Sequence, residues 1–237
     1  MTLEDVLRAP LPDRVDEVAE RLRSIEKALP KRDGVRAFTS LYRAVTEAVD
    51  ERVRPGTFAD APFARWLDVV FANLYLRALR AHVLGPKRPP RAWAPLFEAR
   101  ARPGVAPIQF ALAGMNAHIN RDLPLALVGT CRARKVSPLR GGPQHADFRR
   151  IDGLLAETEA LVRADFATGL IGWADEAFGE LDTIVAMWNV RQARAAAWTN
   201  AETLWALRNL PLTAGRFALT LDRTVGFAGR GLLRPCG

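Results

Sequence analysis

The sequence contains few cysteines and no long apolar run. Its two cysteines, Cys131 and Cys236, form no CxxC motif, which argues against a disulfide framework or a zinc site. No uninterrupted apolar segment reaches the roughly 18 residues that a membrane-spanning helix needs. Alternating apolar and polar residues, the pattern of half-buried strands, are missing as well. These absences leave a helical protein as the prediction.

The familiar catalytic fingerprints are missing too. The chain has no HExxH zinc motif and no ExxH pair of the kind found in di-iron bundles. It also has no GxSxG, P-loop or GxGxxG sequence. The sequence therefore lacks the motifs that would place it among the common hydrolases or nucleotide-binding proteins.

Positive charge is abundant but dispersed. The formal net charge is +8, and arginine greatly outnumbers lysine along the whole chain. Because the basic residues do not cluster, we expect no nucleic-acid partner. Arg216, Arg223 and Arg230 recur at helical spacing, but a solvated helix face explains them better than a membrane surface does. The acidic start of the chain has no signal-peptide core, so we expect a cytoplasmic protein.

Helical periodicity runs through the chain. The length of 237 residues suits one domain over 1–237, with about eight helices in a bundle. Two apolar helices should form its centre, one over 63–79 and one over 105–134. A helix over 181–208 should follow bends at the glycines near 172 and 179, and the segment 209–237 should be peripheral.

Local signals fix several helix ends. Asp33 and Asp60 are predicted N-caps, and the Pro and Gly residues at 55 and 56 should end the helix that begins after Asp33. Tyr42 lies on the apolar face of that helix. It is predicted either to reach a pocket or to be a core residue with its hydroxyl at the rim.

The central helix is apolar around most of its circumference, yet it carries four polar side chains. At helical spacing, His118 and Asp122 lie on one side, while Asn116 and Asn120 lie on the other. Polar groups in a buried helix need partners. Pro124 also predicts a kink or helix end near 120–123, because its ring nitrogen cannot donate to the carbonyl of Asn120.

Two interpretations of this cluster stay open. The residues could be a satisfied core network that only specifies packing. Alternatively, the chain is an enzyme acting on a small molecule, with His118 as general base or metal ligand and Asp122 orienting it. The predicted catalytic set is His118, Asp122, Asn116, Asn120 and Arg194. A non-catalytic module, which uses the cluster to bind a ligand or to form a homo-oligomer, is the alternative function.

A divalent metal is the cofactor that such a cluster would hold. His118 and Asp122 need at least one more ligand, and Asp147 is the first candidate, followed by His145 and Asp152. Arg194 is predicted to pair with Asp147 or Asp122, because a buried carboxylate requires a partner.

Several segments carry a family resemblance. The strongest is the stretch 114–123, which reads GMNAHINRDL. Others are 41–46, 57–60, 71–79, the pair Asp147-Phe148, and Arg194 with the Ala-Trp pair that follows it. On these residues the chain resembles an uncharacterised, mainly actinobacterial family of all-helical proteins, over most of its length. The resemblance implies a helical fold and no particular activity.

Overall fold

The computed structural model describes residues 1–85, 88–169 and 189–235, with the side chains of 157–169 excepted. Over these residues the chain forms helices and no strand, which confirms the predicted all-α fold class. The number of helices is close to the eight expected. The α-helices are α1 (Leu3–Arg8), α2 (Val15–Ala28), α3 (Gly34–Asp50), α4 (Ala61–Leu84), α5 (Ala94–Ala99), α6 (Pro107–Ala117), α7 (Leu123–Arg134), α8 (Pro143–Gly169), α10 (Val190–Ala206) and α11 (Pro211–Leu232).

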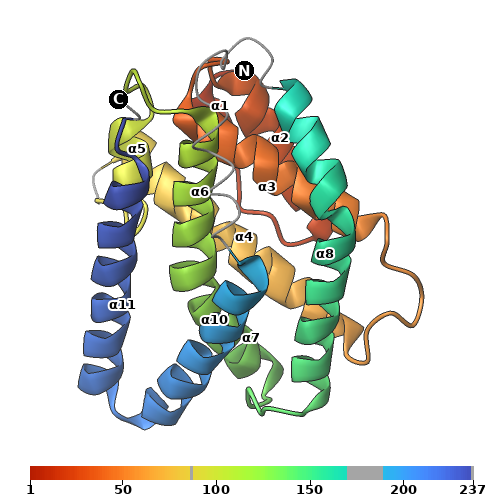
Figure 1. The fold of residues 1–237 in the computed structure, drawn as a ribbon. Helices are drawn as coiled ribbons and strands as arrows, with labels where there is room; N and C mark the ends of the chain where they lie inside the picture. The colour runs from red at the N-terminus through yellow and green to blue at the C-terminus, as the bar shows by residue number, and fades with distance from the viewer. Residues whose placement is uncertain (86–87, 170–188, 236–237) are drawn as a thin grey trace.

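A continuous rod through the bundle corresponds to the helix predicted over 105–134. It consists of α6, a π-helical turn (His118–Asp122) and α7. α6 packs between α3 and α11, while α4 and α10 pack against α7 (Figure 1). Gly114 permits the close approach of α3, because a Cβ at this position would lie 2.3 Å from the ring of Phe38. The rod is therefore enclosed by helices from both halves of the chain.

The π-helical turn occurs where the kink was predicted. The N–H of Leu123 donates to the carbonyl of His118, five residues earlier. Pro124 follows at once and has no N–H to donate to Asn120, so an ordinary α-helical bond is lost at this point. A single π-helical turn inside an α-helix is frequent at functional sites. Here it contains both His118 and Asp122.

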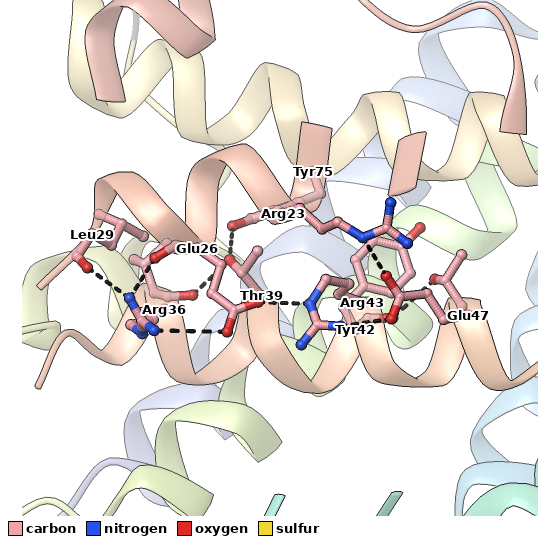
Figure 2. Close-up of polar contacts among 11 residues, drawn as sticks. Arg23, Glu26, Leu29, Arg36, Thr39, Tyr42, Arg43, Glu47 and Tyr75 are labelled. Carbon is pink, nitrogen blue, oxygen red and sulfur yellow. Dashed lines mark hydrogen bonds and ion pairs between the residues drawn. The ribbon is translucent and has the colours of Figure 1, made fainter. Parts of the chain in front are cut away.

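Both predicted N-caps are present, and polar contacts fix α3 against its neighbours. The side chain of Asp33 accepts from the N–H of Val35, and that of Asp60 accepts from the N–H of Phe63. Arg43 of α3 donates across to Glu26 of α2 at 2.7 Å and, within α3, to Glu47 at 2.6 Å (Figure 2). The hydroxyls of Thr39 and Tyr75, 2.7 Å apart, join α3 to α4 (Figure 2). These contacts position α3 and α4, the two helices whose aromatic side chains surround His118.

The C-terminal segment forms α11 along one edge of the molecule (Figure 1). It packs on α6 and α5, and Asn116 donates to the carbonyl of Val225. Arg216, Arg223 and Arg230 are exposed on this helix. In the part of the chain described, no helix combines the length and apolarity that spanning a membrane requires.

Two sequence predictions fall outside the described residues. One is the pair of bends near 172 and 179, and the other is the first part, 181–188, of the helix predicted over 181–208. Cys236 also lies outside the described residues. The described part of that helix is α10, which begins at Val190. Cys131 is a buried free thiol on α7, and burial raises its pKa to about 11.

Gly226→Ala tests how closely α11 must approach the rest of the bundle. A Cβ at Gly226 would lie 2.4 Å from the backbone carbonyl oxygen of Arg91, which cannot rotate away as a side chain could. We expect a loss of about 1–3 kcal/mol in the free energy of unfolding, measured by urea denaturation. Gly215→Ala is the matched control on the same helix, because a Cβ there meets open space. If both variants have the same free energy of unfolding, Gly226 of α11 does not lie as close to the backbone of Arg91 as the structure places it.

Candidate functional site

His118 lies in an aromatic enclosure, with 1% of its surface exposed. Its ring stacks on Phe71 of α4, with centroids 3.5 Å apart and an interplanar angle of 5°. The ring of Tyr42 meets it edge-on at 4.6 Å. Phe38, Tyr75 and Trp93 form the next contacts. Rings on both sides therefore restrict the orientation of the imidazole.

Asp122 fixes the imidazole from one end. This carboxylate is fully buried, and its Oδ2 lies 3.5 Å from His118 Nδ1. The same oxygen accepts from Trp93 Nε1 at 2.9 Å, while Oδ1 accepts from the guanidinium of Arg121 at 2.6 Å. Because Asp122 is an acceptor for each partner, it favours the tautomer in which His118 carries its proton on Nδ1. The predicted pairing of His118 with Asp122 is therefore present.

The other ring nitrogen of His118 receives no hydrogen bond from the described part of the chain. Nε2 is buried and has no partner among the described residues. Burial lowers the pKa of His118, and the nearby Asp122 only partly opposes this effect. The imidazole is therefore neutral near physiological pH, with a free lone pair on Nε2. A buried acceptor left unpaired is unusual and calls for an explanation.

A cavity of about 1040 Å³ lies beside His118. Its walls come from α3, α4, the central rod, α8 and α10, and they are largely apolar. This volume corresponds to the upper end of the range for small-molecule sites. The described apolar side chains in its lining include Leu41, Val45, Val49, Leu112, Met115, Ile119, Ile151 and Val190.

Two further polar groups of the cavity lining lack partners. The hydroxyl of Tyr42 and Oδ2 of Asp68 are buried without a hydrogen bond from any described residue. Burial raises the pKa of Tyr42 well above its usual value, and the charge of Asp68 adds to this effect. Burial, with a contribution from Asp50, raises the pKa of Asp68 to about 6. Tyr42 thus fits the prediction in which it reaches a pocket.

Asp68 was missed by the sequence analysis, although a signal was available. It is the only acidic residue of α4. At helical spacing it also lies on the same face as Phe71 and Tyr75, which is the face turned toward His118. An acid on the apolar face of a central helix is unusual enough to mark a candidate site.

Arg194 lines the same cavity, but its partner differs from the prediction. Its Nε donates to Asp152 at 2.6 Å, and another guanidinium nitrogen donates to the carbonyl of Phe148 at 3.0 Å. The guanidinium also lies 4.1 Å from the centroid of the Phe148 ring. The predicted pairing with Asp147 or Asp122 is therefore wrong, because the packing of α8 on α10 brings Asp152 to Arg194 instead.

Asn116 and Asn120 belong to a different contact. Asn120 Nδ2 donates to Asn116 Oδ1 at 3.0 Å, and Asn116 donates in turn to the carbonyl of Val225 on α11. Neither is among the described residues that line the cavity. The two amides therefore hold α11 on the rod, and the structure does not bring them to His118.

The predicted metal ligands are not brought together either. The two oxygens of Asp147 accept from the backbone N–H groups of Ala59 and Asp60, at 2.8 and 2.7 Å. His145 accepts from the N–H of Gly141. Within the described ranges, no group of three His, Cys, Asp or Glu side chains lies close enough to share a metal ion. Asp147 holds the two residues that precede α4, rather than acting as a third ligand to His118 and Asp122.

Fold and site together define an all-helical protein whose buried histidine adjoins a large apolar cavity. The chain belongs to a family of unknown function, DUF5995, whose model matches residues 15–235. No curated protein and no solved structure matches the chain. The match covers nearly the whole described fold, and it assigns no activity.

Proposed function

We propose that the chain is an enzyme that binds a largely apolar small molecule in the cavity and uses His118 as a general base. The observation that carries this proposal is the unpaired Nε2 of His118 beside a cavity, in a ring whose Nδ1 faces a buried carboxylate. A histidine that served packing alone would not need both features.

The arrangement suits proton transfer. Nε2 of a neutral imidazole accepts a proton from an O–H or N–H of the bound molecule. The imidazolium that results is stabilised by Asp122, which is held in turn by Trp93 and Arg121. The largely apolar lining lowers the local dielectric around the transfer, and the rings of Phe71 and Tyr42 restrict the orientation of the imidazole. Asp122 is therefore a positioning residue, and His118 is the group proposed to touch the substrate.

Chemical modification tests whether Nε2 is reachable through the cavity. We expect diethyl pyrocarbonate to modify His118, and saturating Nile red, a neutral apolar dye, to slow this reaction by about tenfold or more by occupying the cavity. Peptide mass spectrometry measures the extent of modification at each histidine. His145, which does not line the cavity, is the internal control, and its modification should not change with the dye. If His118 stays unmodified after His145 has reacted fully, and the dye does not bind, the cluster is only structural.

Catalysis is distinguished from simple binding by His118→Gln. We expect this variant to bind Nile red within about twofold of the wild-type chain, because the amide fills a similar volume in the apolar cavity. Incubation of both proteins with an organic extract of bacterial cells, followed by mass spectrometry, then compares turnover. A metabolite consumed by the wild type alone supports the enzyme. Binding without any turnover that depends on His118 supports the non-catalytic ligand-binding module.

Other sequence predictions stay proposals. A divalent metal at His118 and Asp122 would need further ligands, which the described residues do not supply, and metal analysis with chelator-dependent melting tests it. Cytoplasmic location, a mainly actinobacterial distribution and assembly into a homo-oligomer likewise rest on the sequence. The absence of a nucleic-acid partner rests on the dispersed charge.

A further inference from the structure

Asp68 carries a carboxylate for which the described residues provide no partner. It forms no hydrogen bond or ion pair with any described residue, and its Oδ2 is shielded from solvent. Burying a carboxylate in this way is unfavourable unless a cation or a set of donors compensates. Asn or Leu at this position would avoid the penalty. The carboxylate lines the same cavity as His118.

We propose that the cavity selects an apolar molecule bearing a protonated amine, and that Asp68 is the counter-ion of the ammonium group. This inference rests on the proposed function, because the amine would occupy the cavity that His118 serves. It adds the chemical class of the substrate, and it assigns a binding role to a residue outside the His118–Asp122 pair.

The unpaired polar atoms of three residues that line the cavity match an ammonium group. His118 Nε2 and the Asp68 carboxylate are acceptors, and the hydroxyl of Tyr42 can also accept. An alkylammonium group offers three N–H donors and no acceptor. Tyr42 and Phe71 add aromatic rings to the same lining, and ring faces attract ammonium groups. A carboxylate-bearing ligand would instead bring acceptors against acceptors.

The other charges of the described cavity lining do not reverse this preference. Arg194 is neutralised by Asp152, at 2.6 Å. Arg54, Arg65 and Arg191 also line the cavity, but they are exposed, so water and salt screen their charges. Asp50 is an exposed acid that reinforces the negative side. The carboxylate of Asp68, whose Oδ2 is shielded from solvent, therefore contributes a negative charge that is only partly screened by water.

Three ligands of equal chain length test the inference. We expect 1-octylamine to displace Nile red from the cavity at about tenfold lower concentration than 1-octanol near neutral pH, because an ion-paired hydrogen bond is stronger than a neutral one. Octanoate should be the weakest of the three. In Asp68→Asn the advantage of octylamine over octanol should disappear, while octanol binds within about twofold of its wild-type affinity. Asp50→Asn is the matched control, and it should keep most of the advantage because Asp50 is exposed.

The outcomes separate the two proposals. If octanol and octylamine bind equally, or octanoate binds best, the amine inference is wrong while the cavity function stands. An advantage of octylamine that persists in Asp68→Asn overturns the role of Asp68. Binding of none of these molecules, the dye included, removes the proposed function itself. The advantage should also shrink as pH falls through about 6, where Asp68 becomes protonated and loses its charge.

Discussion

Asp122→Ala is expected to lower the free energy of unfolding by about 3–5 kcal/mol, the range found when one partner of a buried ion pair is removed. The reason is that Asp122 accepts from two donors and faces a third group, all in the interior. Removing it leaves Trp93 Nε1 without its acceptor and His118 Nδ1 unsupported. The Arg121 guanidinium loses its hydrogen bond of 2.6 Å and keeps a longer ion pair with Asp222, at 3.5 Å. Urea denaturation followed by circular dichroism measures the loss.

Two further variants serve as controls for this loss of stability. Asp16→Ala removes an exposed acid paired with Arg14, and it should change stability by no more than about 0.5 kcal/mol. Asp122→Asn keeps the shape and an acceptor for Arg121, so it should be less destabilising than Ala. A loss below about 1 kcal/mol in Asp122→Ala would show that the carboxylate is not the centre of a buried network.

Asp122→Asn also separates the effect of Asp122 on the tautomer of His118 from its effect on the free energy of unfolding. An amide can donate to His118 Nδ1, and the imidazole proton would then move to Nε2. We expect ¹⁵N chemical shifts to report the Nδ1–H tautomer in the wild type and the Nε2–H tautomer in this variant. The variant would retain its fold and lose the lone pair on which the proposed base depends.

The features that the sequence predicted correctly are local ones. Asp33 and Asp60 cap helices through atoms two or three residues away, so the signal lies within the segment itself. The disturbance next to Pro124 likewise follows from one missing N–H. The burial of His118 and Asp122 follows from a helix that is apolar around most of its circumference.

The features that were missed depend on how helices pack. Asp147 and Asp152 are both acids of α8, but they lie five residues apart and therefore point in different directions around the helix. Only the packing of α8 decides that Asp152 meets Arg194 while Asp147 accepts from the two backbone N–H groups that precede α4. Asn116 and Asn120 were placed correctly on the far side of the rod. Their contact with α11 involves residues about a hundred positions later, which no local pattern reveals.

Asp68→Asn is expected to make the protein more stable at about pH 8, by about 1–3 kcal/mol. In the folded chain the pKa of Asp68 is raised to about 6, mainly by burial. In the unfolded chain it returns to about 3.9. Between these values the folded state binds more protons than the unfolded state, so this group lowers stability as pH rises. A difference of about two pKa units corresponds to about 3 kcal/mol, and water in the cavity should reduce it.

The pH dependence identifies the cause of that gain. Below about pH 4, Asp68 is protonated in the folded state and largely so in the unfolded state, so variant and wild type should be about equally stable. The difference should grow between about pH 4 and 6 and then level off, as measured by urea denaturation across this range. A gain that does not vary with pH would show that Asn merely packs better. If the gain appears and the preference for octylamine is lost in the same variant, then Asp68 lowers the stability of the empty protein and supplies the charge that binds an amine, a trade-off typical of binding sites.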